Sequence, residues 1–245
     1  MKKRYKSFLA VTFTMITLCG CTKSNKTIVR MQKLEEGIEK TPTTEAELKE
    51  AISKYENRIA DMQLATGQVG IWYKMLAVRY LDAQMYGEAL KCLQKAIQIY
   101  PENQNLFYYT GLCAGYMAKA SLDFTAAGNS STAEKYNYLK LAESAYLRAV
   151  EIEPKYGRAL YGLGILYVFE LDMSEKAIPH LEKLLSFDTR NFDAMFVLAR
   201  AYYTTGDYDR AASLYDKIAS QTKSDAKKQE ALANKKIVLD ASYTK

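Results

Sequence analysis

Small and large residues follow one another in a fixed order over residues 72–101, and the same order returns three more times along the chain. The first copy consists of Tyr73, Leu76, Ala77, Tyr80, Ala89, Leu93, Ala96 and Pro101. Small residues let two antiparallel helices approach closely, and large residues fill the gaps between them. Because the 245 residues include only four prolines and twelve glycines, long helices can form. The pattern therefore predicts an all-α chain of stacked helix pairs.

The later copies keep this order with two departures. The second copy has Phe107, Thr110, Gly111, Ala114, then Ala142, Tyr146, Ala149 and Pro154. The third has Leu160, Leu163, Gly164, Tyr167, then Ala177, Leu181 and Leu184. The fourth has Met195, Leu198, Ala199, Tyr202, then Ala211, Tyr215 and Ile218. Ala177 and Ala211 lie 34 residues apart, whereas the second copy has 19 additional residues and the third has one.

This spacing resembles the tetratricopeptide repeat, whose consensus is W-x2-L-G-x2-Y, then A-x3-F, then P. The resemblance covers residues 70–245. It implies a right-handed helical solenoid of about four helix-turn-helix repeats, closed by capping helices at both ends. The first cap is predicted as a helix from Thr44 to about Gln63, within a segment of residues 44–69, and we expect it to pack on the first repeat. The second is a polar helix from Asp225.

The insertion in the second repeat falls between its two helices, at residues 115–141. Residues 131–134 match a capping box, which opens a helix, and Gly128 favours a turn. We therefore predict that the insertion lengthens both helices into a projecting hairpin. A long loop without secondary structure is the alternative. Phe124 and Tyr136 are the predicted contact residues of this arm for a partner protein.

The first 21 residues have the layout of a secretory signal: a basic start, an apolar run from Phe8 to Leu18, and small residues before a cysteine. The apolar run is shorter than the roughly 20 residues that span a bilayer. Residues 18–21 resemble the lipobox of bacterial lipoproteins, which implies cleavage after Gly20 and a diacylglycerol on the sulfur of Cys21. An ordinary cleaved signal and an uncleaved anchor are the alternatives.

Residues 21–43 are polar and charged, and a Thr-Pro-Thr-Thr run closes them, so we predict a tether between the lipid and the folded body. The predicted location is the bacterial cell envelope, on the extracytoplasmic or periplasmic face. Because Thr22 rather than aspartate follows the cysteine, the outer membrane is favoured over the inner one.

Charge gives no sign of nucleic-acid binding. The formal net charge is +6, but four of the 34 basic residues lie in the leader, which has no acidic residue, so residues 21–245 carry +2. A nucleic-acid surface needs a clustered basic face. The basic run at residues 223–236 is interleaved with Asp225 and Glu230, which is typical of a solvated helix face.

No residue constellation indicates catalysis. The single histidine, His180, has no cysteine or second histidine at ligand spacing, and no phosphate-binding glycine loop or nucleophile elbow occurs. We therefore predict no enzyme activity, no metal and no cofactor. Cys92 and Cys113 fit two interpretations, a disulfide in an exported protein or two buried thiols.

The amino-acid composition is unusual in its aromatic residues, which include twenty tyrosines and eight phenylalanines. In tetratricopeptide proteins, positions 2, 5, 9, 12 and 13 of each repeat face a concave groove. In this frame the groove residues are Lys74, Tyr108, Tyr116, Arg158, Tyr161, Phe169, Phe196, Arg200 and Tyr203. Tyrosine and arginine are the residue types that dominate binding hot spots. The resemblance does not extend to the carboxylate-clamp subclass, because Val78 and Tyr109 stand at two of its polar positions.

Two functions fit this groove. In the first, the protein is an envelope-anchored scaffold that binds a segment of a partner protein. In the second, the same aromatic residues enclose a small hydrophobic ligand, as in repeat lipoproteins that accompany solute transporters. The groove could also hold the chain's own terminal helix. A trough open across the repeats favours a segment of a partner protein, whereas an enclosed cavity favours a ligand.

Overall fold

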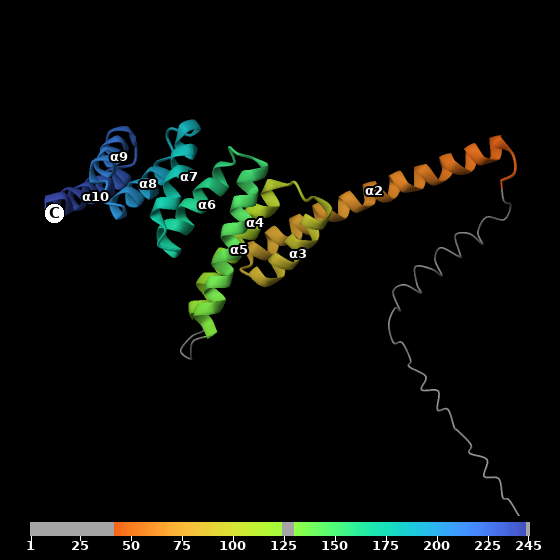
Figure 1. Cartoon of the computed structure of the whole chain (residues 1–245), viewed down its shortest axis with the longest axis horizontal. Coiled ribbons are helices and arrows are strands. Elements are labelled where there is room, and N and C mark those ends of the chain that lie inside the picture. The colour runs from red at the N-terminus through yellow and green to blue at the C-terminus, as the bar shows by residue number, and fades with distance from the viewer. Residues whose placement is uncertain (1–41, 124–129, 244–245) are drawn as a thin grey trace, which may run out of the picture. The chain divides into compact units, whose positions relative to one another are not determined.

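The computed structural model describes residues 42–123 and 130–243, which form helices joined by short turns (Figure 1). The helices are α2 (Glu45–Asp82), α3 (Tyr86–Ile99), α4 (Gln104–Asp123), α5 (Ser130–Ile152), α6 (Gly157–Ile165), the π-helix η1 (Leu166–Glu170), α7 (Ser174–Phe187), α8 (Phe192–Thr204), α9 (Tyr208–Gln221) and α10 (Asp225–Tyr243). Contacts divide the chain into two compact units, and the boundary falls inside α2, between Ile59 and Ala60.

Within the second unit, neighbouring helices pack in chain order. From α3 onward each helix contacts the next one, and α4, α6 and α8 also contact one another across the repeats. This is the arrangement of a solenoid, in which each helix pair is stabilised by its neighbours. The predicted all-α solenoid is therefore confirmed.

The small residues of the pattern lie where the helices meet. Ala89 and Ala96 on α3 are fully buried, as are Ala142 on α5, Ala177 on α7 and Ala211 on α9. The large residues that fill the gaps, among them Leu93, Leu160 and Ile218, are fully buried as well. The register predicted from the sequence is thus the one that the core adopts.

The predicted end of the first helix near Gln63 is wrong, because α2 continues without a break from Glu45 to Asp82. Two glycines, Gly67 and Gly70, lie inside this helix. A Cβ atom on Gly70 would lie 2.7 Å from Cε2 of Tyr100, and the Tyr100 hydroxyl donates a 2.9 Å hydrogen bond to the Gly67 carbonyl. These glycines therefore make room for a ring from α3 and do not break the helix.

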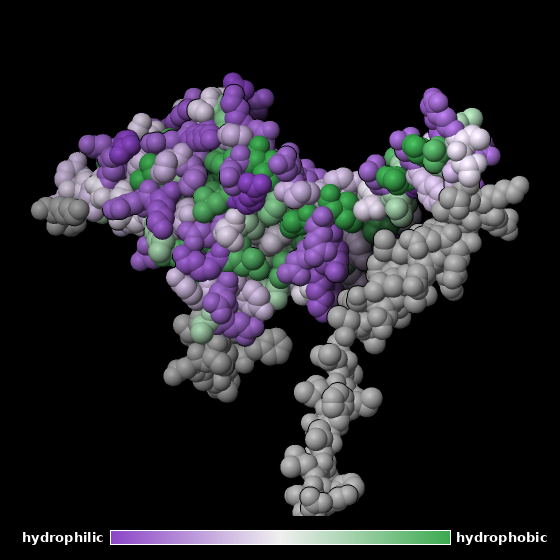
Figure 2. Space-filling model, turned by 45° about the vertical axis from the view of Figure 1, so that its right-hand side comes forward, coloured by the Kyte–Doolittle hydropathy of each residue, from purple (hydrophilic) through white to green (hydrophobic). Residues whose placement is uncertain are grey.

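Several apolar side chains of the chain remain exposed, and Figure 2 shows hydrophobic residues among hydrophilic ones on the face in view. In residues 44–59, the apolar side chains of Leu48, Ile52 and Ile59 are about half exposed. In the described residues, no helix combines the length and the hydropathy that a membrane crossing requires.

Helices α4 and α5 are the longest of the second unit after α2, and they form the insertion. They contain 20 and 23 residues, whereas the equivalent α8 and α9 contain 13 and 14. The two helices pack against each other (Figure 1). Both helices are thus longer than their equivalents in the fourth repeat, while the projecting hairpin itself stays a prediction. Its predicted turn near Gly128 and the contact residue Phe124 lie outside the described residues.

The extra residue of the third repeat is accommodated in η1, a π-helix of five residues that directly continues α6. A π-helix accommodates one additional residue by widening a helical turn. The turn that follows places Asp172 at a positive φ of 52°. The extra residue therefore stays within the first helix of the repeat, and α7 begins in register with the other second helices.

The C-terminal helix begins at Asp225, as the sequence predicted. It packs against α9 and buries Ala231 and Val238, whereas most of its other side chains are exposed. Such a polar outer face suits the last helix of a solenoid.

Candidate functional site

The predicted groove residues all lie on the first helices of the pairs. Lys74 is on α2, Tyr108 and Tyr116 are on α4, Arg158 and Tyr161 are on α6, Phe169 is on η1, and Phe196, Arg200 and Tyr203 are on α8. Because α4, α6 and α8 contact one another, they form one layer of the solenoid. A side chain at a groove position of this layer can therefore contact a bound molecule together with side chains from the neighbouring repeats.

Tyr108 is the centre of an aromatic cluster between the second and third repeats. Its ring lies 5.8 Å from Tyr156, in an edge-on arrangement, and 6.1 Å from Tyr146. The guanidinium of Arg158 lies 6.0 Å from the same ring. Burial raises the pKa of Tyr108, and the nearby Arg158 opposes that rise. The structure therefore brings together two predicted groove residues from adjacent helices, Tyr108 and Arg158.

Two members of this cluster were missed by the sequence analysis. The Tyr156 hydroxyl donates a 2.8 Å hydrogen bond to Oδ1 of Asn105, which joins the turn before α6 to the start of α4. Asn105 stands at position 2 of its repeat, as Arg158 does in the next one, so the frame itself could have found it. Tyr156 lies in the turn after Pro154, where the repeat frame assigns no groove position.

Tyr161 lies beside a pair of opposite charges. Lys227 on α10 donates a 2.6 Å hydrogen bond to Oδ1 of Asp193 on α8. Burial raises the pKa of half-buried Tyr161, Asp193 raises it further, and Lys227 lowers it. Asp193 and Lys227 were also missed, although Asp193 holds position 2 of the fourth repeat. Lys227 therefore neutralises the charge of Asp193 beside Tyr161.

The third group is on α8. The Arg200 guanidinium lies 5.3 Å from the ring of Tyr203, and Tyr203 lies 5.8 Å from Tyr208. The ring of Phe196 lies 6.0 Å from that of Tyr215 on α9. Arg200 is exposed, whereas Phe196 and Tyr203 are half-buried. Such amphipathic rings offer an apolar body and, in tyrosine, a polar tip to a partner.

The remaining predicted groove residues are more peripheral. Phe169 on η1 is 56% exposed. Tyr116 is 44% exposed, and its ring stacks on that of Tyr86 at 4.9 Å. Lys74 is half-buried on α2. Of the predicted arm residues, Tyr136 is described and is 51% exposed, with the Lys140 ammonium 5.5 Å from its ring.

A buried carboxylate joins the base of the hairpin to η1. Glu143 on α5 accepts a 2.9 Å hydrogen bond from the Tyr167 hydroxyl and a 2.8 Å bond from Lys140 Nζ. Burial raises the pKa of Glu143, but the hydrogen bonds from Lys140 and Tyr167 outweigh it, so the pKa lies below 4.5. The folded state therefore favours the charged carboxylate.

This arrangement predicts a pH-dependent contribution to stability. Glu143→Gln should lower the free energy of unfolding at pH 7 by about 1–3 kcal/mol, because hydrogen bonds to a charged group are lost. A lowered pKa stabilises the fold above the unfolded value and loses this effect as pH falls through the folded value. The gap between wild type and variant in urea denaturation should therefore narrow below pH 4.5. A gap that is constant from pH 7 to pH 3 would contradict this, and Glu151→Gln, an exposed change on the same helix, is the control.

The other titratable candidates have packing roles. The ring of His180 stacks on Tyr167 at 6.0 Å, and burial lowers the pKa of this histidine. Cys92 and Cys113 are free and buried, as one of the two interpretations predicted, and burial raises the pKa of the Cys113 thiol to about 12. In residues 42–123 and 130–243, no group of three or more metal-ligating side chains is suitably arranged.

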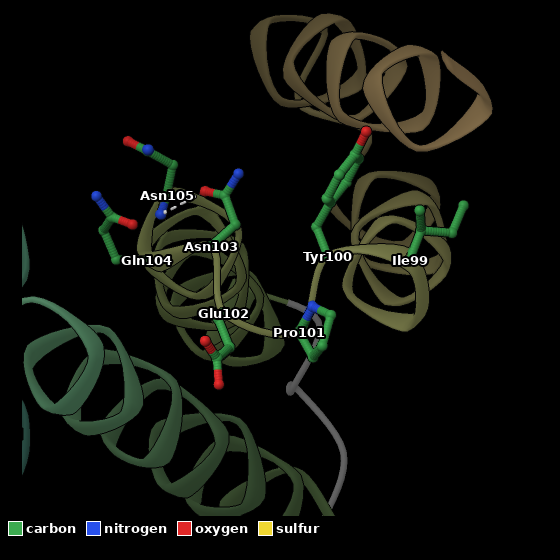
Figure 3. A pocket seen from close by; sticks show the side chains of 7 residues that line it. All are labelled: Ile99, Tyr100, Pro101, Glu102, Asn103, Gln104 and Asn105. Atoms are coloured by element: carbon green, nitrogen blue, oxygen red, sulfur yellow. Dashed lines mark hydrogen bonds between the residues drawn. The ribbon is translucent and has the colours of Figure 1, made fainter. Parts of the chain in front are cut away.

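Three surface pockets in the described part of the chain lie at turns between helices. One has a volume of about 540 Å³ and is lined by the seven consecutive residues from Ile99 to Asn105 (Figure 3). Its polar groups serve the fold: the Asn103 side chain accepts a hydrogen bond from the Asn105 backbone, and Tyr100 points toward α2. Two further pockets lie at the turns around Asp172 and Gly206. None of these three pockets is lined by a predicted groove residue.

Family comparisons agree with this architecture. Models of the tetratricopeptide repeat match residues 71–103 and residues 169–235. A TPR repeat-containing protein of Borreliella burgdorferi is 22% identical over 224 residues, which cover 91% of this chain and 94% of that protein.

Solved structures resemble the chain in fold. The structure of YrrB, described as a TPR protein with an unusual peptide-binding site, has a TM-score of 0.55 and 19% identity, and the match covers 70% of this chain and 76% of that one. The structure of PilW, a type IV pilus biogenesis factor, has a TM-score of 0.51 and 19% identity over 71% of each chain. The chain therefore contains tetratricopeptide repeats within a helical solenoid of the TPR type.

Proposed function

We propose that the protein is a scaffold of the bacterial cell envelope that binds a segment of a partner protein in the concave aromatic groove predicted along α4, α6 and α8. The observation that carries this proposal is the series of aromatic and arginine side chains on these three helices. Three groups follow one another from repeat to repeat: Tyr108 with Arg158, Tyr161 beside Asp193 and Lys227, and Arg200 with Tyr203. Tyrosine, arginine and phenylalanine are enriched at the centres of protein interfaces.

The distribution of these rings favours an extended or helical segment over a small molecule. The aromatic contacts are distributed along the solenoid. Tyr108 contacts Tyr156 between the second and third repeats, whereas Phe196 contacts Tyr215 and Tyr203 contacts Tyr208 in the fourth. A ligand cavity would need these rings to converge and exclude water. A groove that repeats its contacts along the solenoid suits a segment that spans several repeats. YrrB, with its peptide-binding site, shares this fold.

The C-terminal helix leaves this groove accessible to a partner. Helix α10 packs against α9 as the next member of the stack, and Lys227 anchors its first turn to Asp193. Arg158 and Arg200 remain exposed, and Tyr161 and Tyr203 are half-buried. These observations support a groove that is not occupied by the chain's own C-terminal helix.

We also propose that Cys21 carries the lipid anchor and that residues 21–43 hold the solenoid away from the membrane. The motif at residues 18–21 and the apolar run before it support this proposal. Two or more acyl chains give stable membrane attachment, since each buried methylene contributes about 0.8 kcal/mol. The α4/α5 hairpin, through exposed Tyr136, is proposed as a second contact with the partner.

Photocrosslinking in membranes tests the scaffold proposal. A photoreactive amino acid at position 161 of the full chain should form a covalent adduct with a discrete partner protein. The same photoreactive amino acid at position 187 is the matched control, because Phe187 is an exposed aromatic residue on α7, the second helix of its pair. Adducts of the same protein from both positions would contradict a contact specific to the groove. No adduct from position 161, together with a small molecule that co-purifies with the wild type and not with Tyr161→Ala/Phe196→Ala, would favour the ligand alternative.

A further inference from the structure

The first helix of the solenoid exposes a face that is buried in every later repeat. Trp72 is 59% exposed and Leu76 is 39% exposed. The residues at the same two repeat positions on α4, α6 and α8 are at most 6% exposed. They are Leu106, Ala159 and Ala194 at the position of Trp72, and Thr110, Leu163 and Leu198 at the position of Leu76.

The difference has a simple structural origin. Helices α4, α6 and α8 are each packed against the helix that precedes them, namely α3, α5 and α7. Among the described residues no helix precedes α2, and none of the described helices covers the equivalent face of its residues 60–82. An uncovered apolar face of this kind is typical of an interaction surface.

The spacing on this face fits another helix. Met62, Val69 and Leu76 are seven residues apart, and Ala65 and Trp72 fall between them, so apolar side chains recur on average every 3.5 residues. This is the spacing of a coiled-coil seam. The large residues of the seam are 39–65% exposed. A helix with the same repeat is therefore a suitable partner.

We propose that this face, Met62, Ala65, Val69, Trp72 and Leu76, binds the same face of a second copy of this chain, with the two α2 helices antiparallel. The charges at the edge of this face favour a second copy as the partner and an antiparallel orientation. Asp61 and Arg79 are exposed, lie on the same edge of the face and are 18 residues apart. In an antiparallel pair with its two-fold axis near Gly70, Asp61 of each copy faces Arg79 of the other. A parallel pair would place like charges level with each other.

This geometry also makes the seam self-complementary. Around an axis near Gly70, Val69 lies opposite Trp72 of the other copy, and Leu76 lies opposite Ala65, so large residues face smaller ones. A two-fold contact uses the same patch on both copies. Stable interfaces bury about 800 Å² per partner, and a single helix pair lies at the low end of that scale, so we expect dissociation in the micromolar range.

Sedimentation of the full chain in a non-ionic detergent tests this proposal. The wild type should pass from monomer to dimer as its concentration rises from about 1 to 100 µM. Asp61→Arg alone and Arg79→Asp alone should each raise the dissociation constant at least about tenfold, because like charges then meet twice. The double variant, in which the two charges are exchanged, should restore dimerisation. In one copy the two charges are too far apart to interact, so this rescue is specific to the antiparallel pair.

Trp72 gives an independent signal because it is the only tryptophan of the chain. Its fluorescence should shift to shorter wavelength with dimerisation, in step with sedimentation. Asp209→Arg, an exposed change on α9, and the groove variant Tyr161→Ala/Phe196→Ala should dimerise like the wild type. A monomer at 100 µM, or a dimer unaffected by the single charge reversals, would overturn the proposal. If the wild type stays monomeric and Trp72→Lys abolishes the adduct formed from position 161, the face binds a different partner and the dimer proposal is wrong.

Discussion

Replacing Tyr146 by alanine is expected to lower the free energy of unfolding by about 3–5 kcal/mol, the range for removal of a large buried aromatic side chain. Tyr146 is 6% exposed and its ring lies between two glycines on neighbouring helices. A Cβ atom on Gly111 of α4 would lie 2.6 Å from Cε1 of this ring, and one on Gly162 of α6 would lie 2.8 Å from Cζ. A single side chain from α5 therefore fills the space between α4 and α6.

Urea denaturation followed by helical circular dichroism measures this effect. Tyr136→Ala is the matched control, because Tyr136 is on the same helix but 51% exposed, and it should change stability by less than about 0.5 kcal/mol. Gly111→Ala should destabilise by about 1–3 kcal/mol, since the ring has no room to move away. Equal, small effects of the two tyrosine variants would contradict the packing described here.

Replacing Cys21 by serine is expected to transfer the protein from the membrane fraction to the soluble fraction. The diacylglycerol is predicted to be attached to the sulfur of Cys21. Serine has no sulfur, so neither acyl chain would be attached. Without them the chain keeps only its apolar run of residues 8–18, which is shorter than a bilayer span. Fractionation of cell extracts measures the transfer, and labelling with a fatty-acid analogue measures acylation directly.

Cys19→Ser is the matched control for this experiment, because Cys19 lies two residues earlier in the same motif and should not carry the lipid. The control variant should stay in the membrane and remain labelled. A wild type that takes up no fatty-acid analogue would refute the proposed anchor. A Cys21→Ser variant that remains in the membrane fraction would do so as well.

The features that the sequence predicted best are those governed by local packing rules. The small residues Ala89, Ala142 and Ala211 are buried because each permits the close approach that the repeat requires. The start of α10 at Asp225 and the long helices of the insertion follow from helix-forming sequence and turn residues that can be recognised locally. Tyr108 and Arg158, two of the predicted groove residues, lie on the adjacent first helices α4 and α6, with the Arg158 guanidinium 6.0 Å from the Tyr108 ring.

What the sequence did not predict depends on contacts between distant residues. Nothing near Gly67 and Gly70 shows that the ring of Tyr100, 30 residues later, occupies the space beside them and that α2 continues through both. The extra residue of the third repeat could be counted, but its accommodation as a π-helix could not. The pairing of Asp193 with Lys227 likewise required the position of α10.

The most direct test of the proposed scaffold is the affinity of the crosslinked partner for the groove. The partner segment that is captured at position 161 can be synthesised, and its binding to the purified full chain can be measured by calorimetry. We predict that Tyr161→Ala/Phe196→Ala weakens binding at least about a hundredfold, because hot-spot aromatic residues each contribute about 2 kcal/mol or more. Phe187→Ala should leave the affinity unchanged. Binding of equal strength to wild type and groove variant would contradict the account.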